Sequence, residues 1–251
     1  PDQVFYDGVR RFGYGSVPHS GFPGESGGVV RRPGSWDGAT KTTMSYGYGL
    51  NVTPLQIATA YSALANGGKL IAPTFVKGQR NEGKQIIDEN VAKEVVAMME
   101  TVVTQGGAKQ AAVLGYHVAG KTGTARKAGP GGYERGHYNS LFAGVVPATN
   151  PRFATVIVIN DPQGGKFYGG LVSAPVYHNV MEGTLRLMDV PLDDLQSWLA
   201  AQQSGKMGHS ASILPAPPAE AALPADAAAE FDAALPSAQN HVPAPPAGGT
   251  Q

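Results

Sequence analysis

The stretch G-Y-H-V-A-G-K-T-G-T-A-R-K, Gly115 to Lys127, decides between two folds. Its first eight residues match G-x-x-x-x-G-K-[ST], a phosphate-binding loop that requires a strand, a glycine-rich loop and then a helix. The loop positions hold Tyr116, His117 and Val118, which favour strands. Glycine and proline in the following segment, 123–136, exclude a helix. We therefore reject the nucleotide-hydrolase interpretation and predict an extended strand.

The composition excludes several other classes of protein. Lys plus Arg and Asp plus Glu both total 19 of 251 residues, so nothing in the charge balance indicates a nucleic-acid partner. The absence of cysteine excludes disulfides, thiolate metal sites and a cysteine nucleophile. No apolar run approaches the roughly 18–20 residues that cross a bilayer. None of the histidines shows metal-ligand spacing, so we expect no metal and no cofactor. They are His19, His117, His137, His178, His209 and His241.

Helices are predicted in three places, after a loop-rich segment over residues 1–48. The first has Thr53 as its cap, Pro54 in its first turn and Gly67 beyond its end, and its nearly continuous apolar surface predicts burial. The second spans about Glu89 to Gln105 and the third begins near Ser173. The apolar repeat is Val91, Val95, Met98 and Val102 in the second helix, and Tyr177, Met181, Leu185 and Met188 in the third, where Pro175 falls in the first turn.

Three strands are predicted, at 116–125, 140–148 and 152–161. The connection between the later two is too short for a parallel crossover, so we expect antiparallel pairing. The fold class is therefore α+β, an antiparallel sheet flanked by helices. The boundary of the folded part is set at 195. Residues 196–251 are rich in Ala and Pro with few large apolar groups, and this composition predicts a disordered tail.

A G-x-S-x-G match at Gly24 to Gly28 indicates a serine nucleophile only if a strand precedes the serine and a helix follows it. Ser26 has glycine and proline on both sides, so we interpret it as part of a turn. The sequence K-T-G-T, Lys121 to Thr124, is more informative. A glycine in mid-strand weakens a sheet unless something approaches the backbone closely. With the hydroxyls and the lysine beside it, this segment predicts an anion-binding strand edge suited to a carboxylate.

Four segments resemble the transpeptidase domain of class B penicillin-binding proteins of the cell-division type, in the family's order from about residue 8 to 192. They are S-Y-G-Y-G-L-N-V-T-P-L-Q-I-A-T-A-Y-S-A-L-A-N-G-G, H-V-A-G-K-T-G-T-A-R-K, S-L-F-A-G-V-V-P-A-T-N-P-R-F-A-T-V-I-V-I-N-D and F-Y-G-G-L-V-S-A-P-V-Y-H-N-V-M-E-G-T-L-R-L-M. The resemblance implies the penicillin-binding-protein/β-lactamase-like fold. It also implies a D,D-transpeptidase that cross-links peptidoglycan stem peptides during septal wall synthesis through a serine acyl-enzyme, and that β-lactams inhibit.

The resemblance gives the K-T-G-T residues roles in that reaction. Lys121 would place positive charge near the serine and support proton transfer. Thr122 and Thr124 would donate hydroxyl hydrogen bonds to the terminal D-Ala carboxylate, and the N–H of Thr124 would form half of the oxyanion hole. Gly123 would let the substrate peptide lie against the strand.

Further substrate contacts are expected beside this strand. Arg126 shares a face with Thr122 and Thr124 by strand alternation, and we predict it as an auxiliary carboxylate contact, although a solvated arginine is an equal alternative. Tyr138, Phe167 and Tyr168 would form an aromatic wall beside the cleft, with ordinary packing as the alternative. Tyr48 is a weaker candidate on similar grounds.

The family's other two motifs, S-x-x-K and S-x-N, do not occur in the 251 residues. We therefore expect the serine and its activating lysine to lie upstream of Pro1, and the isolated chain to be inactive and to fold poorly. The alternatives are a non-catalytic interaction fragment, or a serine D,D-carboxypeptidase or β-lactamase-type hydrolase. The resemblance further implies a periplasmic location, an N-terminal membrane anchor outside this chain, and a membrane glycosyltransferase as partner.

Overall fold

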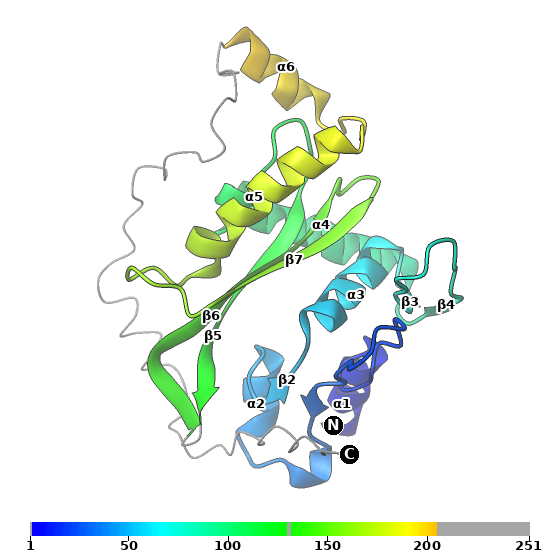
Figure 1. Ribbon diagram of the computed structural model, residues 1–251, viewed down its shortest axis with the longest axis vertical. Helices are drawn as coiled ribbons and strands as arrows, with labels where there is room; N and C mark the ends of the chain where they lie inside the picture. The colour runs from blue at the N-terminus through cyan, green and yellow to red at the C-terminus, as the bar shows by residue number, and fades with distance from the viewer. Residues whose placement is uncertain (1, 130–131, 205–251) are drawn as a thin grey trace.

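A three-stranded antiparallel sheet forms the centre of the fold in the computed structural model, which describes residues 2–129 and 132–204 (Figure 1). The strands are β5 (Ala119–Gly129), β6 (Gly132–Val146) and β7 (Phe153–Asn160), in the order β5-β6-β7. The register pairs Thr124 with Ser140 and Leu141 with Val158, and it shifts between Arg126 and Ala128. The predicted antiparallel pairing is confirmed. Strand β5 extends beyond the predicted end at residue 125, and β6 begins before the predicted start at 140.

Helices cover both faces of this sheet (Figure 1). Helix α5 (Gly169–Leu187) lies across one face, while α3 (Pro54–Ala65) and α4 (Glu89–Thr104) lie on the other. The α5 side contains the larger core cluster, in which Phe142 and Tyr177 meet edge to face at 4.7 Å between ring centroids. The α+β prediction is confirmed.

Helix α3 begins as its sequence predicts. The Thr53 hydroxyl accepts a hydrogen bond from the N–H of Gln56 at 3.2 Å, and the Gln56 carboxamide oxygen accepts one from the N–H of Thr53 at 2.8 Å. This reciprocal pair is a capping box, which satisfies two N–H groups that the helix leaves unpaired. The expected burial is only partly confirmed, because Gln56, Ala60 and Ala63 are buried while the larger apolar side chains are half-buried.

Helix α4 has the predicted bounds, but its buried face is rotated by one residue. The buried side chains are Ala92, Val96, Met99 and Val103, whereas Val91 and Met98 are 47% and 60% exposed. The apolar repeat that we used runs along the edge of the contact with the sheet. Ala92, in the first turn of the helix, is fully buried.

Helix α5 begins at Gly169, ahead of the predicted start near Ser173, so that Pro175 is inside the helix. The two glycines at its start allow a close approach between backbones. A Cβ atom at Gly169 would lie 2.8 Å from the Gly123 carbonyl oxygen, and one at Gly170 would lie 2.1 Å from that of Gly107. Three of the four predicted apolar positions are buried, while Met188 is 54% exposed.

The segment over residues 1–48 is more regular than predicted. It contains α1 (Asp2–Arg11), a 3-10 helix η1 (Pro33–Ser35), α2 (Thr40–Ser45) and β1 (Val29–Val30), which pairs with β2 (Leu50–Asn51). Helix α1 lies in a segment that we predicted as loop, and none of its side chains is buried. The turn assigned to Ser26 is confirmed, since neither a buried strand precedes it nor a helix follows it.

The remaining elements are short or peripheral. Strands β3 (Lys69–Ile71) and β4 (Gly83–Gln85) form a hairpin, and the 3-10 helix η2 (Lys109–Ala111) packs on α5. Helix α6 (Leu195–Gln203) corrects the predicted tail, since residues 196–203 are helical. The rest of that prediction, 205–251, lies outside the described residues. In the part of the chain that the structure describes, no helix is long and apolar enough to span a bilayer.

Candidate active site

Strand β5 is an edge strand of its sheet, and within residues 2–129 and 132–204 no other strand pairs with its outer edge. The N–H of Arg126 points to this outer edge and donates a hydrogen bond to the Tyr48 hydroxyl at 3.1 Å. Alternate residues of an antiparallel strand direct their N–H groups to the same side. The register is regular from Ala119 to Arg126, so the N–H groups of Thr122 and Thr124 also point outward. The K-T-G-T segment therefore offers two backbone donors at an open edge.

A cleft of about 810 Å³ borders this edge. It lies between β5 and β6 on one side and the α2–β2 segment with the start of α3 on the other. Gly123, Thr124, Arg126 and Tyr48 line it, together with Tyr61 of α3. Burial raises the pKa of Tyr61 to about 12, so this phenol stays neutral beside the cleft. The volume lies within the range of ligand-binding sites in proteins.

Gly123 borders the cleft without being required by the packing of the sheet. A Cβ atom added there would meet only the Leu141 side chain, at 3.5 Å or more, which is ordinary contact. The fold therefore has room for a side chain at 123. Its absence leaves the backbone of β5 accessible from the cleft, as the sequence-based interpretation of this glycine requires.

The two threonines and the lysine occupy opposite faces of β5. Thr124 is paired with Ser140 and faces α5, and its hydroxyl oxygen accepts a hydrogen bond from the N–H of Gly169 at 3.2 Å. Thr122 shares this face by alternation. Lys121 lies on the other face, is exposed, and its ammonium donates a hydrogen bond to the Thr122 carbonyl oxygen at 3.0 Å.

The predicted aromatic residues form two groups. Tyr138 stacks on Phe167 with ring centroids 4.1 Å apart, and Phe167 contacts Tyr168 at 4.5 Å. Tyr138 is paired with Arg126 across the strands, so this group stands next to Arg126. Tyr48 belongs to the other group, meeting Tyr133 edge to face at 5.0 Å within the lining of the cleft. Burial raises the pKa of Tyr48, against the opposing effect of its hydrogen bond from Arg126.

Three residues of the site were not predicted from the sequence. The N–H of Gly169 donates to the Thr124 hydroxyl and so positions it. The Tyr133 hydroxyl accepts a hydrogen bond from the N–H of Gly49 at 3.3 Å, which ties the cleft wall to the β5–β6 hairpin. Tyr61 lines the cleft from α3. The Gly169-Gly170 pair was the one available signal, since paired glycines next to a helix indicate close backbone contact.

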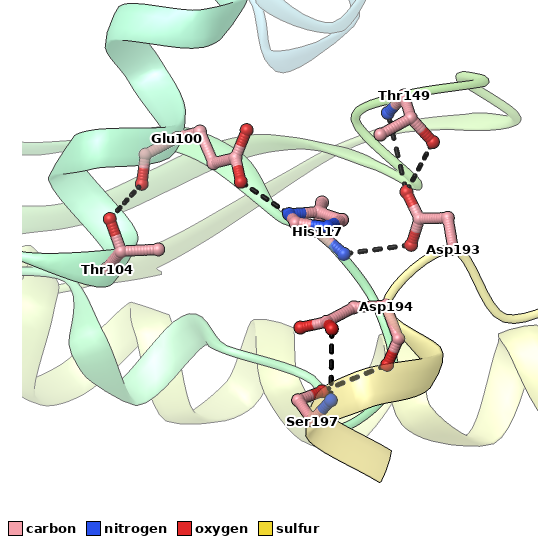
Figure 2. Close-up of polar contacts among 7 residues, drawn as sticks. All are labelled: Glu100, Thr104, His117, Thr149, Asp193, Asp194 and Ser197. Atoms are coloured by element: carbon pink, nitrogen blue, oxygen red, sulfur yellow. Dashed lines mark hydrogen bonds and ion pairs between the residues drawn. The ribbon is translucent and has the colours of Figure 1, made fainter. Parts of the chain in front are cut away.

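A polar junction fixes the start of β5 (Figure 2). The His117 imidazole Nδ1 lies 2.5 Å from a Glu100 carboxylate oxygen of α4, and the His117 N–H donates a hydrogen bond to Asp193 at 2.9 Å. Asp193 also accepts a hydrogen bond from the Thr149 hydroxyl at 2.6 Å. Partial burial opposes protonation of His117, but the hydrogen bond and charge of Glu100 outweigh it, so the pKa of His117 is raised. The junction ties α4, the β6–β7 turn and the α5–α6 connection to the strand.

The described residues contain no group of three or more His, Asp or Glu side chains placed to hold an ion. The site so far consists of backbone donors on an open strand edge, hydroxyls and a lysine beside it, and an adjoining cleft. Such a site can bind a carboxylate and stabilise an oxyanion.

The family model described as the penicillin binding protein transpeptidase domain matches residues 1–182. This chain belongs to that family. It is 43% identical over 217 residues to the peptidoglycan D,D-transpeptidase FtsI of Escherichia coli K12, an alignment that covers 84% of this chain and 37% of that protein. It is 41% identical to the probable peptidoglycan D,D-transpeptidase PbpC of Pseudomonas aeruginosa, covering 75% of this chain and 34% of the relative.

Solved structures of the family share the fold. The transpeptidase domain of Burkholderia pseudomallei penicillin-binding protein 3 matches with a TM-score of 0.70 and 37% identity, covering 76% of this chain and 59% of that one. Penicillin-binding protein 3 of Mycobacterium tuberculosis in complex with ampicillin matches with a TM-score of 0.70 and 32% identity, covering 76% and 47%. The family match confirms the predicted resemblance. The chain spans little more than a third of the length of the E. coli relative.

Proposed function

We propose that this chain supplies the K-T-G-T half of the active site of a peptidoglycan D,D-transpeptidase. The observation on which this rests is the open outer edge of β5, where the Arg126 N–H donates to Tyr48 and the Thr124 N–H points the same way beside the cleft. Membership of the family supports it. The serine would come from an S-x-x-K segment that these 251 residues do not contain.

In the proposed reaction the serine hydroxyl attacks the carbonyl carbon between the two D-alanines of a stem peptide. The Thr124 N–H and the serine N–H stabilise the oxyanion, while Lys121 places positive charge beside the serine and supports proton transfer. The C–N bond breaks, the terminal D-alanine leaves with a proton, and an acyl ester remains. The amine of a neighbouring stem then attacks this ester, which forms the cross-link and releases the serine.

Recognition of the terminal carboxylate is assigned to the α5 side of the strand. The Thr122 and Thr124 hydroxyls donate to the carboxylate, with Arg126 as an auxiliary contact, and a β-lactam carboxylate takes the same place. The Gly169 N–H bond to Thr124 supports this assignment, because it occupies a lone pair of the hydroxyl oxygen and leaves its proton available to a ligand. Phe167, Tyr168 and Tyr138 form the wall beside Arg126, and Tyr48 closes the cleft below it.

The cellular setting follows from the resemblance to division-type enzymes. We propose septal wall synthesis at the periplasmic face of the inner membrane, with an anchor outside these residues and a membrane glycosyltransferase as partner. None of the described helices could serve as the anchor. The glycosyltransferase would be a separate protein.

Covalent labelling with a fluorescent penicillin tests the proposal. The full-length protein should label, whereas residues 1–251 alone should not. Lys121→Ala and Thr124→Pro should each lower the labelling rate of the full-length protein, the second by roughly 10²–10³-fold because it removes an oxyanion donor. Lys109→Ala, an exposed lysine on η2, is the matched control. If a variant with both Lys121→Ala and Thr124→Pro labelled at the rate of the original full-length protein, the assigned roles would be refuted.

Cross-linking and hydrolysis are separated by the acceptor. When a stem-peptide substrate is supplied together with an amine acceptor, a transpeptidase forms the amide product, whereas a D,D-carboxypeptidase or β-lactamase releases the acid. Acid as the main product at saturating acceptor would favour the hydrolase.

A further inference from the structure

A second cavity, of about 420 Å³, lies away from the β5 edge, and the proposed reaction does not use it. It is enclosed by the end of α1 and the loop that follows, by α3, and by the β3–β4 hairpin. Most of its lining is apolar, with Phe12, Val17, Pro18, Leu70, Pro73 and Ile86. Its volume lies within the range of sites that bind small molecules or side chains of a peptide.

The walls of this cavity are held in place by hydrogen bonds. Gln56 is 2% exposed, and the two protons of its carboxamide nitrogen are donated to the carbonyl oxygens of Ser16 and Gly27, at 2.9 and 2.8 Å, with that of Gly13 at 3.3 Å as a shared third acceptor. These bonds anchor the loop after α1 on α3. The hairpin loop is fixed to it, because the N–H of Phe75 donates to the Ser20 carbonyl oxygen at 3.3 Å. A pre-organised site loses less conformational entropy on binding.

Two exposed aromatic rings stand at the tips of these same loops. Phe22 and Phe75 are 64% and 68% exposed and meet edge to face at 5.8 Å, and the neighbouring Val76 is 58% exposed. Exposed apolar side chains that lie together, rather than singly, are typical of interaction surfaces. Phe75 and Val76 belong to the loop of the same β3–β4 hairpin that encloses the cavity, in which Ala72 and Pro73 are lining residues.

The charged residues around the cavity are mostly cationic. Arg10, Arg11 and Lys84 line the cavity together with a single anion, Glu82. None of the four forms an ion pair with another described residue. The complementary ligand is therefore a segment with large apolar side chains and acidic residues next to them.

The chain itself contains such a segment, among residues that the structure does not describe. Beyond residue 204 the only Lys or Arg is Lys206, whereas the acidic residues Glu220, Asp226, Glu230 and Asp232 fall within thirteen positions that also hold Leu223 and Phe231. We propose that the segment 220–235 of this chain binds in the cavity between α1 and the β3–β4 hairpin. Phe231 is the apolar anchor, and Glu230 and Asp232 contact the cationic rim.

The connection is long enough for this contact. From Ser204 to Glu230 the chain has 26 residues, which span at most roughly 90 Å when extended. A domain of this size has a radius of gyration of about 16 Å, so the segment reaches every part of the surface. Because the segment is tethered, its effective concentration at the cavity is high, so that a weak contact is sufficient.

Distance measurement in the full-length protein tests this proposal. The 251 residues contain no cysteine, so Lys77→Cys beside the aromatic tips and Ala234→Cys in the segment provide two defined spin-label positions, once any cysteine elsewhere is replaced by serine. Double electron–electron resonance should show a narrow, short-distance population. Phe231→Ala should abolish it, and so should the pair Arg11→Glu with Lys84→Glu. Adding Glu230→Lys and Asp232→Lys to the reversed pair should restore it.

Matched variants separate the contact from general effects. Leu214→Ala, an apolar tail residue outside the segment, and Lys109→Glu, a charge reversal on η2, should leave the short-distance population unchanged. A broad distribution that is indifferent to Phe231 and to the rim charges would overturn the proposal. So would a short distance that disappears on dilution with unlabelled protein, because the ligand would then be a second copy of the chain.

Discussion

The two faces of the central sheet are built for different purposes. On the α5 face, Phe142, Tyr177, Met181 and Leu185 are at most 1% exposed, and the core is closed along the helix. On the other face, Ala143 and Val145 are fully buried beneath α3 and α4, but Leu141 and Val158 line the open cleft. The same strand β6 therefore contributes to both. The larger closed core therefore lies on the α5 side, while half of the other face borders an open cleft.

The strongest test of this comparison changes neighbouring residues of β6. Phe142→Ala should lower the free energy of unfolding by about 3–5 kcal/mol, because it leaves a cavity in a closed core. Leu141→Ala, next to it on the cleft side and half-buried, should cost only about 1–2 kcal/mol. Urea unfolding of the full-length protein measures both. Equal losses would mean that the two faces do not differ as described.

A buried polar pair joins the closed face to α5. The hydroxyls of Ser140 and Ser173 are 2.8 Å apart and both residues are 0% exposed. Ser173→Ala should cost about 1–3 kcal/mol in urea unfolding, because Ser140 is left buried without this partner. The double change Ser140→Ala with Ser173→Ala should recover most of that loss. A double variant as unstable as the sum of the singles would contradict this coupling.

Gly123 lies on the open face of the sheet, at the cleft. Gly123→Ala should leave the free energy of unfolding within about 1 kcal/mol of the original, because the added methyl group makes only ordinary contact with Leu141. Penicillin labelling should nevertheless fall at least tenfold, about 1.4 kcal/mol, since the methyl group projects where a ligand approaches the strand. Loss of stability together with labelling would instead indicate a packing role.

The smallest expected effect is a pH dependence at the junction in Figure 2. Because the pKa of His117 is raised in the folded protein, its pairing with Glu100 contributes fully below the unfolded pKa of about 6.5 and is lost as pH rises through the folded pKa. The two side chains are 36% and 29% exposed, so the contribution is limited to about 0.2–1 kcal/mol. The stability difference between the original protein and His117→Gln should therefore shrink from about pH 6 to about pH 8.5, in low-salt urea unfolding. A difference independent of pH would exclude this pairing.

Local signals made parts of the fold predictable. The Thr53–Gln56 capping box and the alternating strands are encoded within a few residues, so the start of α3 and the pairing of β6 with β7 followed from the sequence. The buried face of α4 did not, because it is set by contacts with α3 and β5, which are formed by other segments of the chain. The start of α5 was displaced because Gly169 and Gly170 are typical helix breakers, and their tight contacts with Gly123 and Gly107 involve distant segments.

The candidate site divides in the same way. The K-T-G-T strand and the face shared by Thr122, Thr124 and Arg126 followed from the motif and from strand alternation. Tyr138, Phe167 and Tyr168 were expected as one wall and lie together, while Tyr48, named separately, pairs with Tyr133, which the sequence did not indicate. The Tyr48 hydroxyl bond to Arg126 joins residues 78 positions apart, a distance at which local patterns predict nothing.

The open edge of β5 exposes the protein to unwanted strand pairing. A row of outward N–H groups is a template on which any extended chain can assemble, including the same strand of another molecule. Here one of those groups is occupied by the Tyr48 hydroxyl, which shortens the template. Any extended ligand that paired with the remaining groups would cover the template further.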